Sequence, residues 1–451
     1  MKAPDRLVNP DRLVNPDRLV NPDRLVNKEK TMPVPNRPTL SAPTPRPPGA
    51  PLALAGIRVA DFSHFIAGPL CSMILADLGA EVIKIEKADG GDDFRRLRPP
   101  VTEQEGAPYL WANRNKKSIA LDLKQPEACR IAREIIDRSD VVLENFSTGV
   151  MAKFGLDYAT VSAENPRLIY ASVSAYGRDG DLRDRLGFDP IVQAESGFMS
   201  MNGEPDRAGV RTGPSIMDMS TAMMTCNAVL AALFARERLG HGQFVESALF
   251  DTGVTMVGFH AMNYLVSGDE STRFGNNSRD TVPTAAMETA DGPIFVACAN
   301  DRTWQRMAVH VLDRPDLAEH PDYAKTRERT RNRDALMAIV RGILETKPRA
   351  YWLARTREAG VPAGAINSIA EAFGSTEMRA RGLVHAIPHP TAGSVPNIRL
   401  PIRLHGTPLA DPVAAPGLSQ NATEILRDLL DYDAVRIEAV MGSGAVAASG
   451  L

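Results

Sequence analysis

The stretch that decides the fold class is residues 54–87, LAGIRVADFSHFIAGPLCSMILADLGAEVIKIEK. Residues 57–60 predict a short buried strand, and a loop then leads to a predicted helix over residues 69–80. This helix has a proline in its first turn and a glycine at its end, as helices prefer. Residues 81–87 alternate and are rich in branched side chains, which predicts a second strand. The stretch therefore predicts a β-α-β unit.

An acidic residue, Glu86, ends the second strand much as in NAD-binding folds. The dinucleotide fingerprint also needs three glycines where the first strand meets the helix, so that the backbone can approach a pyrophosphate. The loop here contains only Gly68. The sequence therefore argues against NAD binding.

The alternation of strands and helices continues beyond this unit. Further strands are expected at residues 117–123, 140–145 and 167–176, with a helix at residues 126–139. Such alternation predicts an α/β fold with a mostly parallel sheet that helices cover on both faces.

The length of 451 residues favours two domains, because a single core rarely grows past about 300 residues. Residues 4–27 are four copies of PDRLVN, which can neither form a helix nor bury a core. We divide the chain into a disordered extension (1–50), a large domain (51–245), a linker (246–280), a small α/β domain (281–370) and a C-terminal segment that returns to the large domain (371–451).

Composition excludes several classes of protein. A net charge of −3 does not favour nucleic acid or anionic membranes as partners. The four cysteines lack metal-ligand spacing, so we expect buried thiols in a reducing compartment, with no metal site. No apolar signal segment is visible at the N-terminus. The uncharged stretch 219–235 predicts a buried helix. We therefore expect a cytoplasmic protein.

One carboxylate stands out in residues 213–224, GPSIMDMSTAMM, where Asp218 is surrounded by small residues and four methionines. On the helix predicted from residue 215 to 239, it shares a face with Thr221 and Thr225, which leaves room for a ligand. Two interpretations remain open. Asp218 could interact with free N–H groups in the first helical turn, or it could carry chemistry.

Basic residues cluster in the first half of the chain. Lys87 and Asn145 lie at carboxyl ends of predicted strands, where parallel sheets bind ligands, and a polyphosphate would suit this position. Alternatively, each cation is a solvated surface residue. The cations in question are Lys87, Arg95, Arg96, Arg98, Arg114, Lys116, Lys117, Lys124 and Lys153.

Six motifs together resemble one known family. In chain order they are AGPLCSMILADLGAEVIKIE, NRNKKSIALDLK, ENFSTGVMAKFG, GFDPIVQAESG, RTGPSIMD and GHGQFVESALFD. In this order and spacing they resemble the class III CoA-transferases, of the formyl-CoA transferase and carnitine CoA-transferase type. The resemblance covers approximately residues 52–410.

The resemblance implies a Rossmann-like large domain completed by the C-terminal segment, a small domain, and a homodimer of two interlocked ring-shaped subunits. It places Asp218 at the nucleophilic aspartate. It implies that coenzyme A or an acyl-CoA is a substrate, with no permanently bound cofactor, and that a small carboxylic acid is the other substrate. The positions that it places beside coenzyme A are Ile66, Ala67, Lys87, Leu121, Lys124, Asn145, Phe146 and Lys153.

The implied reaction moves CoA from an acyl-CoA to a free acid through an aspartyl anhydride and an aspartyl-CoA thioester. Backbone N–H groups at the helix start or in a glycine loop would stabilise the oxyanions. Formyl-CoA transferase has a run of glycines in a mobile loop, whereas residues 274–280 here, FGNNSRD, contain only Gly275. The resemblance therefore does not extend to a glycine-rich loop over the site.

Two other functions are alternatives to CoA transfer. Related α-methylacyl-CoA racemases have a proton-shuttling histidine where this chain has Phe188, and phenylalanine cannot move a proton. The racemase hypothesis is therefore weaker than the CoA-transferase hypothesis. The second alternative is a non-catalytic α/β protein that binds CoA or a nucleotide. The next residue, Asp189, is expected either beside the site as a hydrogen-bond acceptor or as a helix cap.

Overall fold

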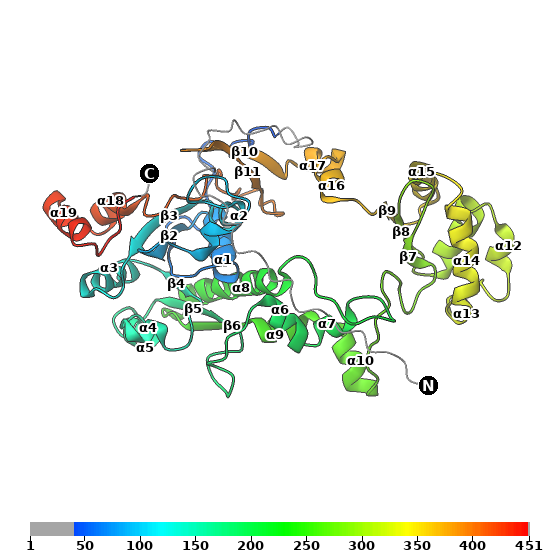
Figure 1. Ribbon diagram of the computed structural model, residues 1–451, viewed down its shortest axis with the longest axis horizontal. Coiled ribbons are helices and arrows are strands. Elements are labelled where there is room, and N and C mark those ends of the chain that lie inside the picture. Colours follow the sequence, from blue (N-terminus) through cyan, green and yellow to red (C-terminus); the bar gives the residue numbers. More distant parts are fainter. Residues whose placement is uncertain (1–39, 450–451) are drawn as a thin grey trace, which may run out of the picture. The chain divides into compact units, whose positions relative to one another are not determined.

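The computed structural model describes residues 40–449 (Figure 1). The PDRLVN repeats therefore lie outside the described residues. The expectation of disorder up to residue 50 does not hold for residues 40–50. The carbonyl of Ser41 accepts a hydrogen bond from the backbone of Ala386 at 2.9 Å, and the backbone of Arg46 donates to Asp411 at 2.7 Å.

A six-stranded sheet forms the centre of the large domain (Figure 1). All neighbouring strands are parallel, in the order β3-β2-β1-β4-β5-β6. This confirms the α/β class, and the order is that of dinucleotide-binding folds, with the topological switch between β1 and β4. The strands are β1 (Arg58–Asp61), β2 (Glu81–Lys87), β3 (Lys116–Leu121), β4 (Val141–Glu144), β5 (Ile169–Ser174) and β6 (Phe244–Ala248).

Helices connect these strands and pack against the sheet. The predicted helices 69–80, 126–139 and 215–239 correspond to α1, α3 and α8. The helices of this region are α1 (Ala67–Asp77), α2 (Ala107–Asn113), α3 (Pro126–Asp137), α4 (Val150–Lys153), α5 (Tyr158–Ser162), α6 (Asp189–Glu195), α7 (Phe198–Met201) and α8 (Ile216–Leu239), with a short 3-10 helix, η2 (Asp93–Arg96).

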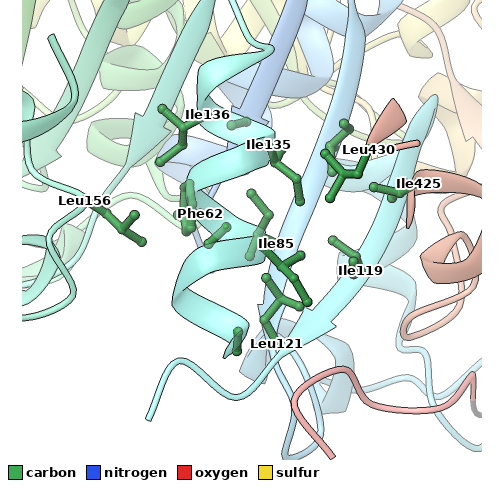
Figure 2. Packing of buried hydrophobic residues seen from close by; sticks show 14 of the residues in the cluster. Phe62, Ile85, Ile119, Leu121, Ile135, Ile136, Leu156, Ile425 and Leu430 are labelled. Atoms are coloured by element: carbon green, nitrogen blue, oxygen red, sulfur yellow. The ribbon is translucent and has the colours of Figure 1, made fainter. Parts of the chain in front are cut away.

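Two apolar cores lie on opposite faces of the sheet, because successive residues of a strand point to opposite sides. Val59 packs in the core with α1 and α8, whereas Ala60 packs in the core with α3. Figure 2 shows the second of these cores, where Ile135 and Ile136 of α3 lie near Ile85 of β2. Burying these branched side chains stabilises the folded sheet by about 25 cal/mol per Å² of apolar surface removed from water.

Helix α8 is apolar and 24 residues long, so by length and composition it is the one helix within residues 40–449 that could cross a membrane. It contacts α1, β5 and β6, and Met217, Cys226 and Val229 are among its buried side chains. Met223, Met224 and Phe234 of the same helix are exposed, so the prediction of a buried helix holds for only one of its faces. The cysteines are free thiols, of which Cys71, Cys226 and Cys298 are buried and Cys129 is half-buried.

The C-terminal segment completes the sheet edge next to β3. The backbone of Asn421 donates to the carbonyl of Ser118 at 3.0 Å, and the backbone of Ala447 donates to the carbonyl of Ala120 at 2.9 Å. Ile425 and Leu430 enter the same core as α3 (Figure 2). The elements are α18 (Ala422–Glu424), a π-helical turn η4 (Ile425–Leu429) and α19 (Ala434–Gly442).

A second, antiparallel sheet has its own core, which includes the buried Trp304 and Leu336. Its strands are β7 (Thr284–Met287), β8 (Ile294–Ala297) and β9 (Ala363–Ala365). The accompanying helices are α11 (Asp301–Arg306), a π-helical turn η3 (Met307–Val311), α12 (Pro315–Glu319), α13 (Thr326–Arg331), α14 (Arg333–Leu344) and α15 (Arg349–Ala359).

The remaining elements follow β6 and β9. Residues 246–280 include the helices α9 (Leu249–Met256) and α10 (Phe259–Ser267). After β9 come α16 (Ile369–Phe373), α17 (Thr376–Arg381) and an antiparallel hairpin of β10 (Val384–His389) and β11 (Gly393–Ile398).

Candidate active site

Asp218 lies in the first turn of α8, and a second carboxylate fixes the start of this helix. One oxygen of Asp189, Oδ2, accepts hydrogen bonds from the backbone of Met217 at 2.7 Å and of Asp218 at 3.3 Å. The other oxygen, Oδ1, accepts from the buried amide of Gln193 at 2.6 Å. Asp189 therefore caps α8 and lies beside Asp218, which combines the two roles considered from the sequence.

The first backbone donors of α8 are all engaged. Besides those that bind Asp189, the N–H of Ile216 donates to the carbonyl of Pro214 at 2.9 Å and that of Met219 to the carbonyl of Ser215 at 3.0 Å. The helix start therefore has no free N–H group for an oxyanion. The expectation that this terminus could supply such donors is wrong for this structure.

The carboxylate of Asp218 has no hydrogen-bond or ion-pair partner among residues 40–449. Burial, together with the negative charge of Asp189, raises the pKa of Asp218 to about 7. A carboxylate with such a pKa is half ionised at neutral pH and more basic than an ordinary aspartate, which favours nucleophilic attack. These features favour the chemical interpretation of Asp218 over a purely helix-capping one.

The loop between β1 and α1 is held at several points. Asn145, which follows β4, accepts from the backbone of His64 at 2.9 Å and donates to the carbonyl of the same residue at 2.9 Å. The backbone of Phe65 donates to Asp92 at 3.1 Å, and its φ of 62° places it in the left-handed region. This costly conformation is kept because neighbouring groups fix the loop on both sides.

A network of buried ion pairs lies beside this loop and contacts it. Lys116 lies 3.1 Å from Asp61, and Lys84 lies 3.0 Å from Asp92, with all four side chains almost fully buried. Burial alone would raise the pKa of Asp61, but Lys116, Lys84 and the hydrogen bonds from Ser63 and Ser72 together outweigh it and hold this pKa at about 2. Lys84 also donates to the carbonyl of Ser63 at 2.8 Å. No residue pattern marks Lys84, which lies between two isoleucines, as paired inside the protein.

Some cations considered for a polyphosphate are not available to one. Arg95 is buried with Glu86 at 2.7 Å, Arg114 is buried with Asp77 at 2.6 Å, and Lys116 is buried with Asp61. For these residues both sequence interpretations, a phosphate contact or a solvated surface cation, are wrong. They are internal counterions.

A cavity of about 200 Å³ opens where the carboxyl ends of β1, β2 and β4 meet. It brings together two predicted residues, Lys87 and Phe146, with His64 and Asp93. Lys87 is exposed and lies 2.8 Å from Asp93, and the rings of Phe146 and His64 are 5.4 Å apart. Asn145 adjoins this cavity through its two bonds to His64.

The other predicted contacts do not line this cavity. Ile66 and Ala67 begin α1, Lys124 is exposed beyond β3, and Lys153 is exposed at the end of α4. Leu121 is only 1% exposed and belongs to the core, so only its backbone remains for a ligand.

An aromatic pair connects this region to the start of α6, where Asp189 lies. The ring of Phe188 is 6.3 Å from that of Phe65, whose own ring is 5.7 Å from His64. Phe188 is 61% exposed, so its ring is open to a ligand. No residue pattern marks Phe65 as part of a site. Its positive φ is visible only in the structure.

Within residues 40–449, no three His, Cys, Asp or Glu side chains are grouped in a way that could hold a metal ion.

The family model CoA-transferase family III matches residues 54–422. The chain belongs to CoA-transferase family III. This membership agrees with the resemblance read from the six sequence motifs.

Similar members of CoA-transferase family III act on dicarboxylates, as their names state. The chain is 36% identical to a succinate–glutarate CoA-transferase of Agrobacterium fabrum, over 83% of this chain and 95% of the relative. It is 35% identical to an acetyl-CoA:oxalate CoA-transferase of Acetobacter aceti, over 76% and 87%. A crystal structure of a CAIB/BAIF family protein from Brucella suis superposes with a TM-score of 0.77 at 34% identity, covering 84% of this chain and 100% of that chain.

Proposed function

We propose that the protein transfers CoA between small dicarboxylates, with Asp218 as the nucleophile. The observation that carries this proposal is the Asp218 carboxylate itself: partly buried, without a counterion, and held by the Asp189 cap at the start of α8. Family membership supplies CoA thioesters as substrates. The names of the relatives, which include succinate, glutarate and oxalate, support dicarboxylic acids as acceptors.

In the proposed reaction, the ionised Asp218 attacks the thioester carbonyl of the donor and expels CoA thiolate, which leaves an aspartyl–acyl anhydride. The thiolate attacks the aspartyl carbonyl, so the donor acid departs and an aspartyl–CoA thioester remains. The acceptor carboxylate attacks this thioester and releases the thiolate again, with a new anhydride. Attack of the thiolate on the acceptor carbonyl gives the new acyl-CoA and returns Asp218 as a carboxylate.

We propose that CoA enters over the carboxyl ends of β1, β2 and β4, where Lys87 and Phe146 line the cavity and Asn145 adjoins it. Ligands of open parallel sheets bind at this edge, beside the topological switch. Ile66 and Ala67, the backbone of Leu121, Lys124 and Lys153 remain proposed contacts for the rest of the coenzyme. Because helix α8 has no free donors, the oxyanion donors must come from another segment.

We further propose that two copies associate, as the resemblance implies for an interlocked homodimer. Helix α10 supports this, because none of its side chains is buried in the described residues. Phe259, Leu265 and Val266 are 66%, 73% and 81% exposed. Apolar groups this exposed on one helix are typical of a protein interface.

The direct test is mass spectrometry of protein quenched with hydroxylamine during turnover of succinyl-CoA and glutarate. We expect a hydroxamate on Asp218, and no product from Asp218→Ala, which should still bind CoA. Ordinary turnover by Asp218→Ala would refute the nucleophile. Deuterium incorporation at the α-carbon of a 2-methylacyl-CoA in heavy water would instead indicate a racemase, which the phenylalanine at 188 disfavours.

A further inference from the structure

A second cavity, of about 590 Å³, lies at the opposite edge of the sheet from the proposed CoA site. Asp77, at the end of α1, and Arg114, just before β3, contribute to its wall, so it adjoins the amino ends of the strands. The other walls come from residues 41–47, from the β10–β11 hairpin and from residues 403–412. Its volume is in the range of small-molecule sites.

The charges around this cavity are not balanced. Five arginines that line it form no ion pair among residues 40–449; these are Arg46, Arg379, Arg381, Arg399 and Arg403. The two carboxylates in the lining are already engaged. Asp77 pairs with Arg114 at 2.6 Å, and Asp411 accepts the backbone N–H of Arg46 at 2.7 Å. Concentrated positive charge in a concave site attracts anions.

A buried histidine gives an independent indication. His385 lines the cavity although it is only 5% exposed, and its Nε2 lies 2.8 Å from the amide nitrogen of Asn397. The amide donates this bond, so Nε2 accepts and Nδ1 carries the proton of the neutral ring. Nδ1 has no partner in the described residues. Burial and the charges of Arg114 and Arg399 lower the pKa of His385, which favours the neutral ring.

We propose that this cavity binds a small multivalent anion, either a di- or tricarboxylate or a phosphate compound. Guanidinium groups match carboxylate and phosphate oxygens in paired geometry, and several of them would engage an anion that carries two or more charges. The neutral His385 would add one N–H donor. The site is separate from Asp218 and does not depend on the proposed function.

The test is isothermal titration calorimetry at constant ionic strength with tricarballylate and with pyrophosphate, and with acetate as the monovalent control. The Asp218→Ala protein is used without CoA, and the arginine variants described next distinguish binding in this cavity from binding at the proposed active site. We expect saturable binding of at least one multivalent probe and none of acetate. The probe that binds distinguishes a carboxylate from a phosphate ligand.

The variant Arg399→Gln/Arg403→Gln should weaken this binding at least tenfold, because each lost guanidinium removes charge-assisted hydrogen bonds. Arg302→Gln removes an exposed, unpaired charge outside the cavity and should bind as the parent does. If the first variant does not fold by circular dichroism, Arg379→Gln/Arg381→Gln replaces it. Unchanged affinity in a folded double variant, or no saturable binding of either probe to the parent, overturns the proposal.

Discussion

The carboxylate of Asp189 lies 3.3 Å from the backbone nitrogen of Asp218 and holds the first turn of α8 that carries this residue. A cap normally stabilises a helix through the unpaired N–H groups. Here the same cap also places a negative charge beside a second carboxylate, so Asp189 both positions Asp218 and raises its pKa. Asp189 therefore combines the capping of α8 with an electrostatic effect on the proposed nucleophile.

Replacing Asp189 by Asn should shift the activity toward acid pH. The amide keeps a hydrogen-bond acceptor for α8 but removes the charge, so the pKa of Asp218 falls, while burial still keeps it raised. We expect the ratio of kcat/KM at pH 6 to that at pH 8 to rise roughly two- to fivefold. Gln193→Met, which alters the support of Asp189 without a charge, should leave this ratio unchanged. An unaltered pH profile in Asp189→Asn would contradict the coupling.

Replacing Asp218 by Asn should stabilise the protein at alkaline pH. The pKa of Asp218 is about 7 when folded and near 3.8 when unfolded, so the native state binds more protons between these values and loses stability as pH rises through this window. Asn cannot ionise and escapes this loss. Urea unfolding should show a gain on the order of 1–3 kcal/mol at pH 8 and little at pH 4. An equal effect at both pH values would show that ionisation is not the cause.

Lys116→Met should strongly destabilise the large domain. The change leaves the buried Asp61 with Lys84 as its nearest remaining cation, and breaking a buried ion pair costs about 3–5 kcal/mol. The double variant Asp61→Asn/Lys116→Met should recover part of this loss. As a control, Lys117→Met removes a half-exposed partner of Glu81 and should cost less than about 1 kcal/mol. Chemical unfolding of the variants measures these differences. Equal costs for Lys116→Met and Lys117→Met would disprove the buried pair.

Asn145→Ala should weaken acyl-CoA binding more than it slows the chemical steps. The variant loses both hydrogen bonds to the backbone of His64, so the loop before α1 is held less firmly. We expect KM for acyl-CoA to rise roughly five- to twentyfold, with a smaller change in kcat. Asn165→Ala, which removes a 3.4 Å bond to the carbonyl of Ser139 near the amino ends of β4 and β5, should change neither. Steady-state kinetics separates the two parameters, and an unchanged KM in Asn145→Ala would be evidence against this loop as part of the site.

Much of the local structure could be predicted. The strand at residues 81–87 and the helix ending at residue 239 lie where the pattern places them, because alternation, prolines and capping glycines act over a few residues. The antiparallel hairpin of β10 and β11 was not predicted. Its sequence, VHAIPHPTAGSVPNI, contains prolines within both strands, which normally argue against strands.

By itself, then, the sequence determined the α/β class, the family and the position of Asp218 in a first helical turn, since these depend on local patterns and on motifs in order. Only the tertiary structure decided that Asp189 lies beside Asp218, that Lys84 and Lys116 are buried counterions, and that residues 421–447 close the edge of β3. These relationships join residues that are far apart in the chain. The free energy that selects them comes from burial and charge pairing in the folded protein, which no local pattern encodes.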